Sequence, residues 1–200
     1  MRDDGLRTLQ LLYLIGGVIG LAAALILAVE KVELLKDPTY TPSCSLNPVL
    51  NCGSVMVTPQ AEAFGLPNPF LGLVGFSVIA ATGALLQAGA VPRRWYWLGL
   101  QGGVTFAAGF VGWLVFQSLY RIGALCPYCM VVWAVTVPLF VYTTLWNARS
   151  GVFGERIAGS RTTAAASTNH ALLLTIAYLG LLTLVLERFW TYWNSLVRLT

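Results

Sequence analysis

The four cysteines of this 200-residue chain fall into two pairs, and one pair has the spacing of a redox centre. Cys126 and Cys129 enclose Pro127 and Tyr128 in a C-x-x-C motif, directly before an apolar run that starts at Met130. The N-terminus of a helix carries unpaired N–H groups and positive potential, which stabilise a thiolate. We expect Cys126 at the helix cap, Pro127 at the first helical position and Cys129 in the first turn. The motif therefore predicts a reactive thiol pair at a helix end.

The other pair, Cys44 and Cys52, lies far upstream, and four cysteines allow three pairings. If the resting bonds are Cys44–Cys52 and Cys126–Cys129, electron transfer between them needs a transient bond that links the two pairs. Two alternatives remain open: a zinc site built from all four cysteines, and an inert structural disulfide between Cys44 and Cys52. The single histidine, His170, lies at the opposite end of a span, so we expect neither a metal site nor a catalytic role for it.

These motifs must be positioned by membrane helices, because the chain is 57% hydrophobic and only 10% charged. A soluble domain is roughly a quarter charged, and a spanning helix needs about 20 mostly apolar residues. We predict an all-α membrane protein with a four-helix transmembrane bundle and a fifth transmembrane helix. The predicted spans are Leu9–Val29, Phe70–Gly89, Trp95–Leu119, Met130–Trp146 and Ala171–Leu186.

The distribution of basic residues predicts that the N-terminus is cytoplasmic. With Arg2 and Arg7 inside, seven of the twelve Lys and Arg residues lie on the cytoplasmic side, which agrees with the positive-inside tendency. Both cysteine pairs then face outward, where oxidising conditions favour disulfide chemistry. The basic residues are spread among helix ends and form no stripe with interleaved aromatic residues, so we expect no nucleic-acid binding.

Three further features organise the chain. In the outer loop 30–69, the segment Val55–Phe64 is either an irregular loop or a helix that Thr58 caps and Gly65 ends. Residues 147–170 are rich in small and polar types, and we expect a flexible cytoplasmic connector. Small residues spaced by four are expected where helices pack closely: Gly16, Gly20 and Ala24 in the first span, and Gly99/Gly103 and Ala108/Gly112 in the third.

The order and spacing of these motifs resemble the vitamin K epoxide reductase family, in its bacterial branch. The resemblance covers roughly Leu9–Trp146. It rests on Cys44 and Cys52 in the outer loop, the run Phe64-Gly65-Leu66-Pro67-Asn68-Pro69 before the second span, and Cys126-Pro127-Tyr128-Cys129 before the fourth. It implies a catalytic core over residues 1–146, with residues 171–200 forming a fifth helix and a short outer tail.

By this resemblance, Cys129 faces a membrane quinone, and Cys126 receives electrons from Cys52. Cys44 meets the external reductant. Asn68 matches the family's hydrogen-bond donor to a quinone carbonyl, and Thr58 matches a hydroxyl position in the loop helix. Trp133 stands where vertebrate members have a tyrosine, and we expect it in the wall of the quinone site.

The resemblance implies a thiol:quinone oxidoreductase of the bacterial plasma membrane. Some relatives continue into a fused thioredoxin-like domain, whereas this chain stops at Thr200, so we expect a separate DsbA-like exported thiol oxidase as partner. The quinone is expected to be menaquinone or ubiquinone, of the vitamin K type, in an apolar pocket walled by aromatic residues. The candidates for this wall are Phe70, Phe76, Phe110, Trp113, Tyr120 and Trp133.

A strongly oxidising partner disulfide, at about −120 mV, requires a comparably oxidising acceptor. The chain has no dinucleotide-binding motif, and a lipid-soluble quinone needs only an apolar pocket with one or two polar anchors. One rival interpretation is a reductase of quinones, quinone epoxides or exported thiols that runs on a dithiol donor. Another is a non-enzymatic membrane scaffold with structural disulfides.

Overall fold

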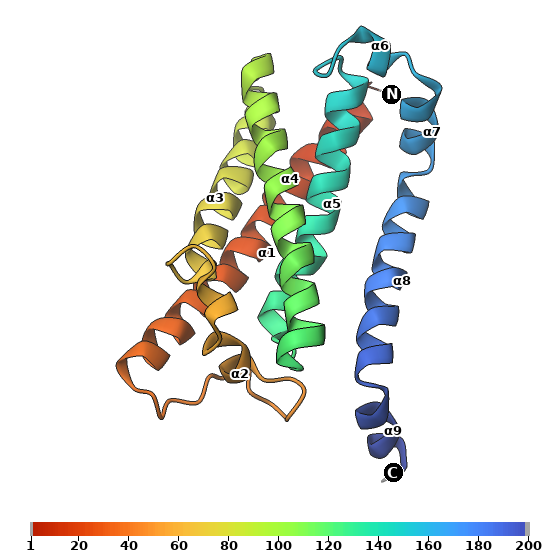
Figure 1. Ribbon diagram of the computed structural model, residues 1–200. Helices are drawn as coiled ribbons and strands as arrows, with labels where there is room; N and C mark the ends of the chain where they lie inside the picture. The colour runs from red at the N-terminus through yellow and green to blue at the C-terminus, as the bar shows by residue number, and fades with distance from the viewer. Residues whose placement is uncertain (1, 199–200) are drawn as a thin grey trace.

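The computed structural model describes the backbone of residues 2–198 and the side chains of residues 5–194. Its described part is helical and contains no strand, which confirms the all-α prediction. Five helices are long and apolar enough to cross a membrane (Figure 1). They are α1 (Arg2–Lys36), α3 (Asn68–Gln87), α4 (Arg94–Gln117), α5 (Pro127–Arg149) and α8 (His170–Arg188).

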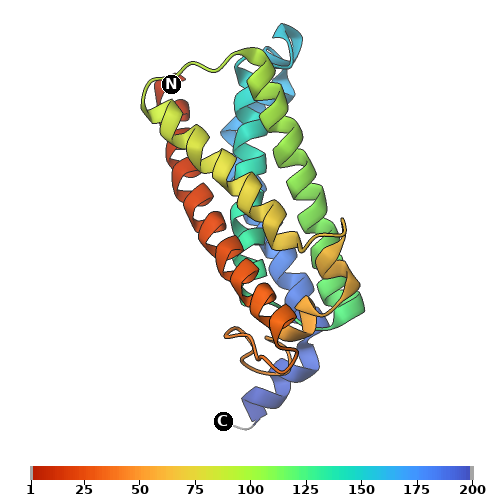
Figure 2. The same ribbon diagram turned by 90° about the vertical axis from the view of Figure 1, so that its left-hand side faces the viewer.

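Helix α1 is the centre of the bundle, because it packs against both α3 and α5. Figure 2 shows α1 and α3 side by side along most of their length. Glycines allow this close approach: a Cβ at Gly17 would lie 2.6 Å from the backbone N of Ala80, and a Cβ at Gly83 would lie 2.5 Å from that of Leu14. Gly20 lies against the ring of Phe76. The small-residue prediction is therefore correct for the first span.

The same prediction is wrong for the third span. A Cβ built at Gly99, Gly103 or Gly112 would meet no described atom within 4 Å. Helix α4 contacts mainly α5, and its glycines do not lie at that contact. A four-residue spacing of small residues therefore does not by itself show that this face of the helix packs against another helix.

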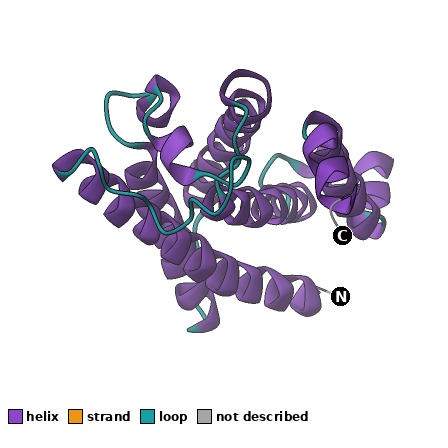
Figure 3. Cartoon of the chain, turned by 90° about the horizontal axis from the view of Figure 1, so that it is seen from below, coloured by secondary structure: helices purple, strands orange, loops and turns teal. Residues whose placement is uncertain are grey.

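The short elements of the long loop gather at one end of the bundle, opposite the N-terminus (Figures 1 and 3). Helix α2 (Cys52–Met56) and the 3₁₀ helix η1 (Pro59–Glu62) replace the single helix considered for Val55–Phe64. Thr58 separates them, and its hydroxyl donates to the carbonyl of Val55 at 2.8 Å instead of capping η1. Gly65, with φ of +74°, ends the segment as expected.

The connector between α5 and α8 lies at the other end and is not irregular. It contains α6 (Glu155–Ala158) and α7 (Arg161–Thr168). The hydroxyl of Ser160 accepts a hydrogen bond from the backbone N–H of Thr163 at 3.2 Å and so caps α7. The connector was predicted to be flexible, and this prediction is corrected by the two helices. The sequence contains the cap residue Ser160 but no apolar periodicity, so the pattern did not indicate a helix.

Helix α8 is held to α5 at a defect in the α5 backbone. Pro138 lies inside α5 and has no N–H, so the carbonyl of Ala134 lacks its usual partner four residues later. The hydroxyl of Tyr178 on α8 donates to this carbonyl at 2.6 Å. In a bilayer such a carbonyl has no water to bond, so the contact gives α8 a defined docking position.

We expect Tyr178→Phe to lower the free energy of unfolding by roughly 1 kcal/mol, the usual contribution of such a hydrogen bond. In a Pro138→Ala background the loss should be much smaller, because residue 138 then donates its own N–H to Ala134. Reversible unfolding in mixed micelles measures the free energy lost on Tyr178→Phe in the wild-type and Pro138→Ala backgrounds, which together form a double-mutant cycle. Equal costs in the two backgrounds would refute the pairing of this tyrosine with the defect.

Candidate redox site

A single backbone bridge brings the two cysteine pairs together. The backbone N–H of Leu125 donates to the carbonyl of Val49 at 2.7 Å, and that of Asn51 donates to the carbonyl of Leu125 at 2.8 Å. Leu50 and Leu125 thus form an isolated parallel bridge. Cys52 follows Leu50 by two residues and Cys126 directly follows Leu125, so the bridge brings the two cysteines close together.

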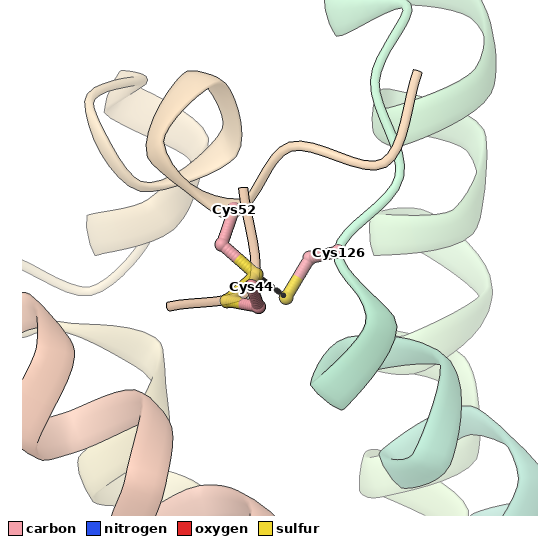
Figure 4. A group of neighbouring side chains, drawn as sticks. All are labelled: Cys44, Cys52 and Cys126. Carbon is pink, nitrogen blue, oxygen red and sulfur yellow. Dashed lines mark hydrogen bonds between the residues drawn. A yellow bond between two sulfur atoms is a disulfide. The ribbon is translucent and has the colours of Figure 1, made fainter. Parts of the chain in front are cut away.

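The sulfurs of Cys44, Cys52 and Cys126 form a compact group (Figure 4). Cys44 and Cys52 are joined in a disulfide, and the Sγ of Cys126 lies 3.2 Å from that of Cys52. All three sulfurs lie within 4.8 Å of one another, and all three residues are buried. Cys126 and Cys129 are not bonded to each other. Zinc binds thiolates, whereas two of these sulfurs are already joined, so this is the geometry of thiol–disulfide exchange.

Cys126 is the N-cap of α5, as the sequence predicts, with Pro127 at the start of the helix. Its Sγ accepts a hydrogen bond from the backbone N–H of Cys129 at 3.3 Å. The pKa of the Cys126 thiol is lowered, chiefly by a hydrogen bond from the Cys129 thiol, and the N–H groups of Cys129 and Tyr128 add to this against the effect of burial. Cys126 is therefore the cysteine of this pair suited to carry the thiolate.

Next to the sulfurs lies a cavity of about 590 Å³ with a mostly apolar lining, which includes Cys126 and Cys129. Its walls come from α1, α3, α4 and α5, and α2 and η1 cover it. Tyr96, near the start of α4, also lines it. The cavity therefore connects the redox pair with the apolar interior of the bundle.

A model of the vitamin K epoxide reductase family matches residues 11–144. The chain belongs to this family of oxidoreductases. The match ends within α5, so α8 and α9 (Trp190–Arg198) lie beyond the matched region. Membership supports membrane thiol and quinone redox activity.

The residues predicted to contact the quinone all line this family member's cavity: Asn68, Thr58, Trp133 and Cys129. The Asn68 amide donates to the carbonyl of Gln60 at 2.7 Å and accepts from the N–H of Ala63 at 3.2 Å. It thus joins α3 to the segment that covers the cavity. Of the aromatic residues predicted for the wall, Phe76, Phe110 and Trp133 line the cavity, whereas Phe70, Trp113 and Tyr120 do not.

Two buried charged residues, Glu30 and Lys31, hold the covering segments in place, and both lie just beyond the predicted end of the first span at Val29. Glu30 accepts hydrogen bonds from the hydroxyl of Tyr40 at 2.9 Å and from the backbone N–H of Ser43 at 3.2 Å, next to Cys44. Lys31 donates to the carbonyl of Met56 at 2.8 Å and pairs with Glu62 at 2.9 Å. In the sequence, two adjacent charged residues, Glu30 and Lys31, directly after an apolar run were the pattern that could have indicated these contacts.

The C-terminal end of α8 packs against residues next to the redox site. Val185 and Phe189 pack in one cluster with Val49, Leu125 and Trp133, which are neighbours of the cysteines in sequence or space. The guanidinium of Arg188 donates through Nε to the carbonyl of Leu119 at 2.7 Å. The fifth helix is therefore not peripheral at this end, although most of its length is exposed.

Proposed function

We propose that this protein is a membrane thiol:quinone oxidoreductase that reoxidises a DsbA-like exported thiol oxidase and so supports disulfide formation. The observation that carries the proposal is the contact of 3.2 Å between Cys52 and Cys126, beside a cavity that Cys126 and Cys129 line. A relay needs one disulfide within reach of a second thiol pair, and a lipid-soluble acceptor needs an apolar pocket beside that pair.

The relay begins at Cys44. A thiolate of the reduced partner attacks Cys44, which breaks the Cys44–Cys52 bond and releases Cys52. The second partner thiol then displaces Cys44 from this mixed disulfide, and the partner leaves oxidised. The Cys52 thiolate attacks Cys126 in a Cys126–Cys129 disulfide and releases Cys129. Cys44 next attacks Cys52 and frees Cys126. The observed arrangement, with Cys44–Cys52 bonded and Cys126 and Cys129 free, corresponds to the end of this internal transfer.

A quinone supplies the acceptor for two electrons and two protons. The Cys126 and Cys129 thiols give up these electrons and protons as their sulfurs join, so the net change is partner dithiol plus quinone to partner disulfide plus hydroquinone. The residues that line the cavity fit a quinone. Most of them are apolar, and the few polar side chains include Asn68 and Thr58. We propose Asn68 as a carbonyl donor through its second N–H, and Trp133 as part of the wall.

We place the protein in the bacterial plasma membrane with its N-terminus in the cytoplasm and its cysteines outside. The excess of basic residues at inner helix ends supports this orientation. The N-terminus and the cysteine segments lie at opposite ends of the bundle, which is consistent with it. Residues 1–146 are proposed as the catalytic core, 147–170 as the cytoplasmic connector and 171–200 as the fifth helix with its tail.

Partner access requires a change at Cys44, whose side chain is only 4% exposed. The hydrogen bonds from Ser43 and Tyr40 to Glu30 hold this segment against α1. The described arrangement therefore serves the internal transfer, and docking of the partner releases the segment that carries Cys44.

The test is turnover by purified protein with a reduced DsbA-like oxidase and a quinone. Each single Cys→Ser change at positions 44, 52, 126 and 129 should reduce turnover to the uncatalysed rate. Ser54→Ala is the matched control, because Ser54 lies in α2 two residues after Cys52 and its side chain is exposed. Variants that retain turnover would support a scaffold instead, and net reduction of the partner would support the opposite direction.

A further inference from the structure

One polar side chain in the cavity wall has no partner for its buried oxygen. Gln117 is the last residue of α4, and it lines the cavity. Its side-chain oxygen Oε1 is buried and accepts no hydrogen bond from any described residue. Buried polar atoms are nearly always paired in native proteins, so such an atom in a ligand-sized cavity requires an explanation.

The other polar groups of the wall are mostly committed to the protein itself. Of the buried unpaired side-chain atoms within the described residues, only that of Gln117 belongs to a residue that lines the cavity. Side-chain hydrogen bonds link Thr58 to Val55, Asn68 to Gln60 and Ala63, Thr136 to Val132, and Tyr96 to Thr82. The Gln117 Oε1 is therefore an acceptor that no described protein group uses, whereas the side-chain oxygens of these neighbours already take part in hydrogen bonds within the protein.

The backbone around Gln117 is also unusual. A π-helical turn, η2 (Ser118–Ile122), follows it immediately, and the N–H of Gly123 donates to the carbonyl of Ser118 at 2.9 Å. Such turns often occur at functional sites. Three residues after Gly123 the chain reaches Cys126, and Ser118, Ile122, Cys126 and Cys129 all line the same cavity. Gln117 thus belongs to the redox end of the cavity.

We propose that the Gln117 amide is a hydrogen-bonding anchor for the electron acceptor, which the proposed function identifies as a quinone. A primary amide has both a donor and an acceptor. Its N–H donates to a carbonyl of the oxidised ring, and its oxygen accepts from a hydroxyl of the reduced ring. The same side chain therefore binds the acceptor before and after the electrons arrive, with no charge introduced into the apolar cavity.

This role predicts an unusual combination of effects for Gln117→Leu. The substitution removes an unpaired buried oxygen and keeps a side chain of similar size, so the melting temperature of the ligand-free protein should stay the same or rise. The dissociation constant for a quinone should increase about tenfold, as expected when one hydrogen bond is lost. A residue that only supports the fold would show the opposite pattern.

The experiment uses the full-length protein in detergent and menadione with ¹³C at its carbonyl carbons. Isotope-edited infrared spectra report the carbonyl stretch of the bound ring, and quenching of tryptophan fluorescence reports the dissociation constant. In Gln117→Leu the carbonyl band should move toward the frequency of free menadione. The control is Thr136→Val, which also lines the cavity but loses a hydroxyl that is already bonded to Val132. This variant should keep the wild-type band and affinity.

The outcomes separate this inference from the function on which it rests. If the wild-type protein binds no menadione, the quinone assignment itself fails. If the wild type binds menadione and Gln117→Leu shows the same band and the same dissociation constant, the role of Gln117 is overturned while the function stands. A loss of affinity in both Gln117→Leu and Thr136→Val would also overturn it, because the effect would then reflect general disturbance of the cavity.

Discussion

A protein that retains only Cys52 and Cys126, in the double variant Cys44→Ser/Cys129→Ser, is expected to oxidise to a stable Cys52–Cys126 disulfide in nearly every molecule. The two sulfurs already lie 3.2 Å apart and both residues are fully buried. A disulfide requires about 2.05 Å between sulfurs, so only a small side-chain rotation is needed. With Cys44 and Cys129 absent, no neighbouring thiol can reopen the bond.

Mass spectrometry of unreduced proteolytic fragments identifies this bond directly. The matched control is Cys52→Ser/Cys129→Ser, which keeps Cys44 and Cys126. In that control the bond should form more slowly, because the bridge at Leu125 aligns Cys126 with Cys52 and not with Cys44. A faster reaction between Cys44 and Cys126 would show that the relay enters the helix-end pair through a different sulfur.

A large loss of affinity for a long-tailed quinone is expected when Gly103, in the middle of α4, is replaced by leucine. Gly103 lines the cavity, and a Cβ there would meet no described atom within 4 Å, so leucine can be accommodated but occupies cavity space. Fourteen residues of helix place Gly103 about 21 Å from the end of α4, too far for a ring that contacts Cys129. This part of the cavity is suited to the prenyl tail of a quinone.

Gly103→Leu should therefore weaken binding of a long-tailed menaquinone by about a hundredfold or more, because displacing one isoprene unit loses several buried carbons at about 0.8 kcal/mol each. Tail-less menadione should bind as before. The protein itself should become no less stable, since leucine favours a helix more than glycine does. Titration of each quinone against tryptophan fluorescence measures these affinities.

The control for this substitution is its neighbour. Gly102 has the same open surroundings on the same helix, but it does not line the cavity. Gly102→Leu should leave both affinities unchanged. Equal losses for menadione and menaquinone in Gly103→Leu would place the ring, and not the tail, at this position and would contradict the site proposed at Cys129.

The sequence predicts those features that depend on local chemistry. Runs of apolar residues suffice to locate five spanning helices, because the length and polarity of a span are properties of the segment itself. The cap at Cys126 with Pro127 behind it is equally local. Thr58 was interpreted as a cap for the same reason, but its hydroxyl bonds backward to Val55 because a tighter turn separates α2 from η1.

Features that depend on contacts between distant segments were not predictable. The bridge that aligns Cys52 with Cys126 involves a single residue pair and leaves no pattern in the sequence. Gly99 and Gly103 of α4 have the spacing of a packing face but line a cavity. Likewise, only the three-dimensional arrangement shows that Gln117 has an unpaired oxygen or that Tyr178 meets the defect at Pro138.

The most direct test of the relay is an anaerobic reaction with limiting quinone, in which the electrons lost by the partner are compared with the electrons gained by the quinone. Purified protein is mixed with an excess of reduced DsbA-like oxidase and a limiting amount of menaquinone, and partner thiols and hydroquinone are measured in the same quenched samples. After subtraction of the partner disulfides that the protein's own disulfides form in samples without quinone, we predict one new partner disulfide for each hydroquinone. A Cys126→Ser protein should form no hydroquinone and at most one partner disulfide per molecule, from its Cys44–Cys52 bond. Hydroquinone that forms without partner disulfide, or partner thiols that increase, would contradict the proposed electron path.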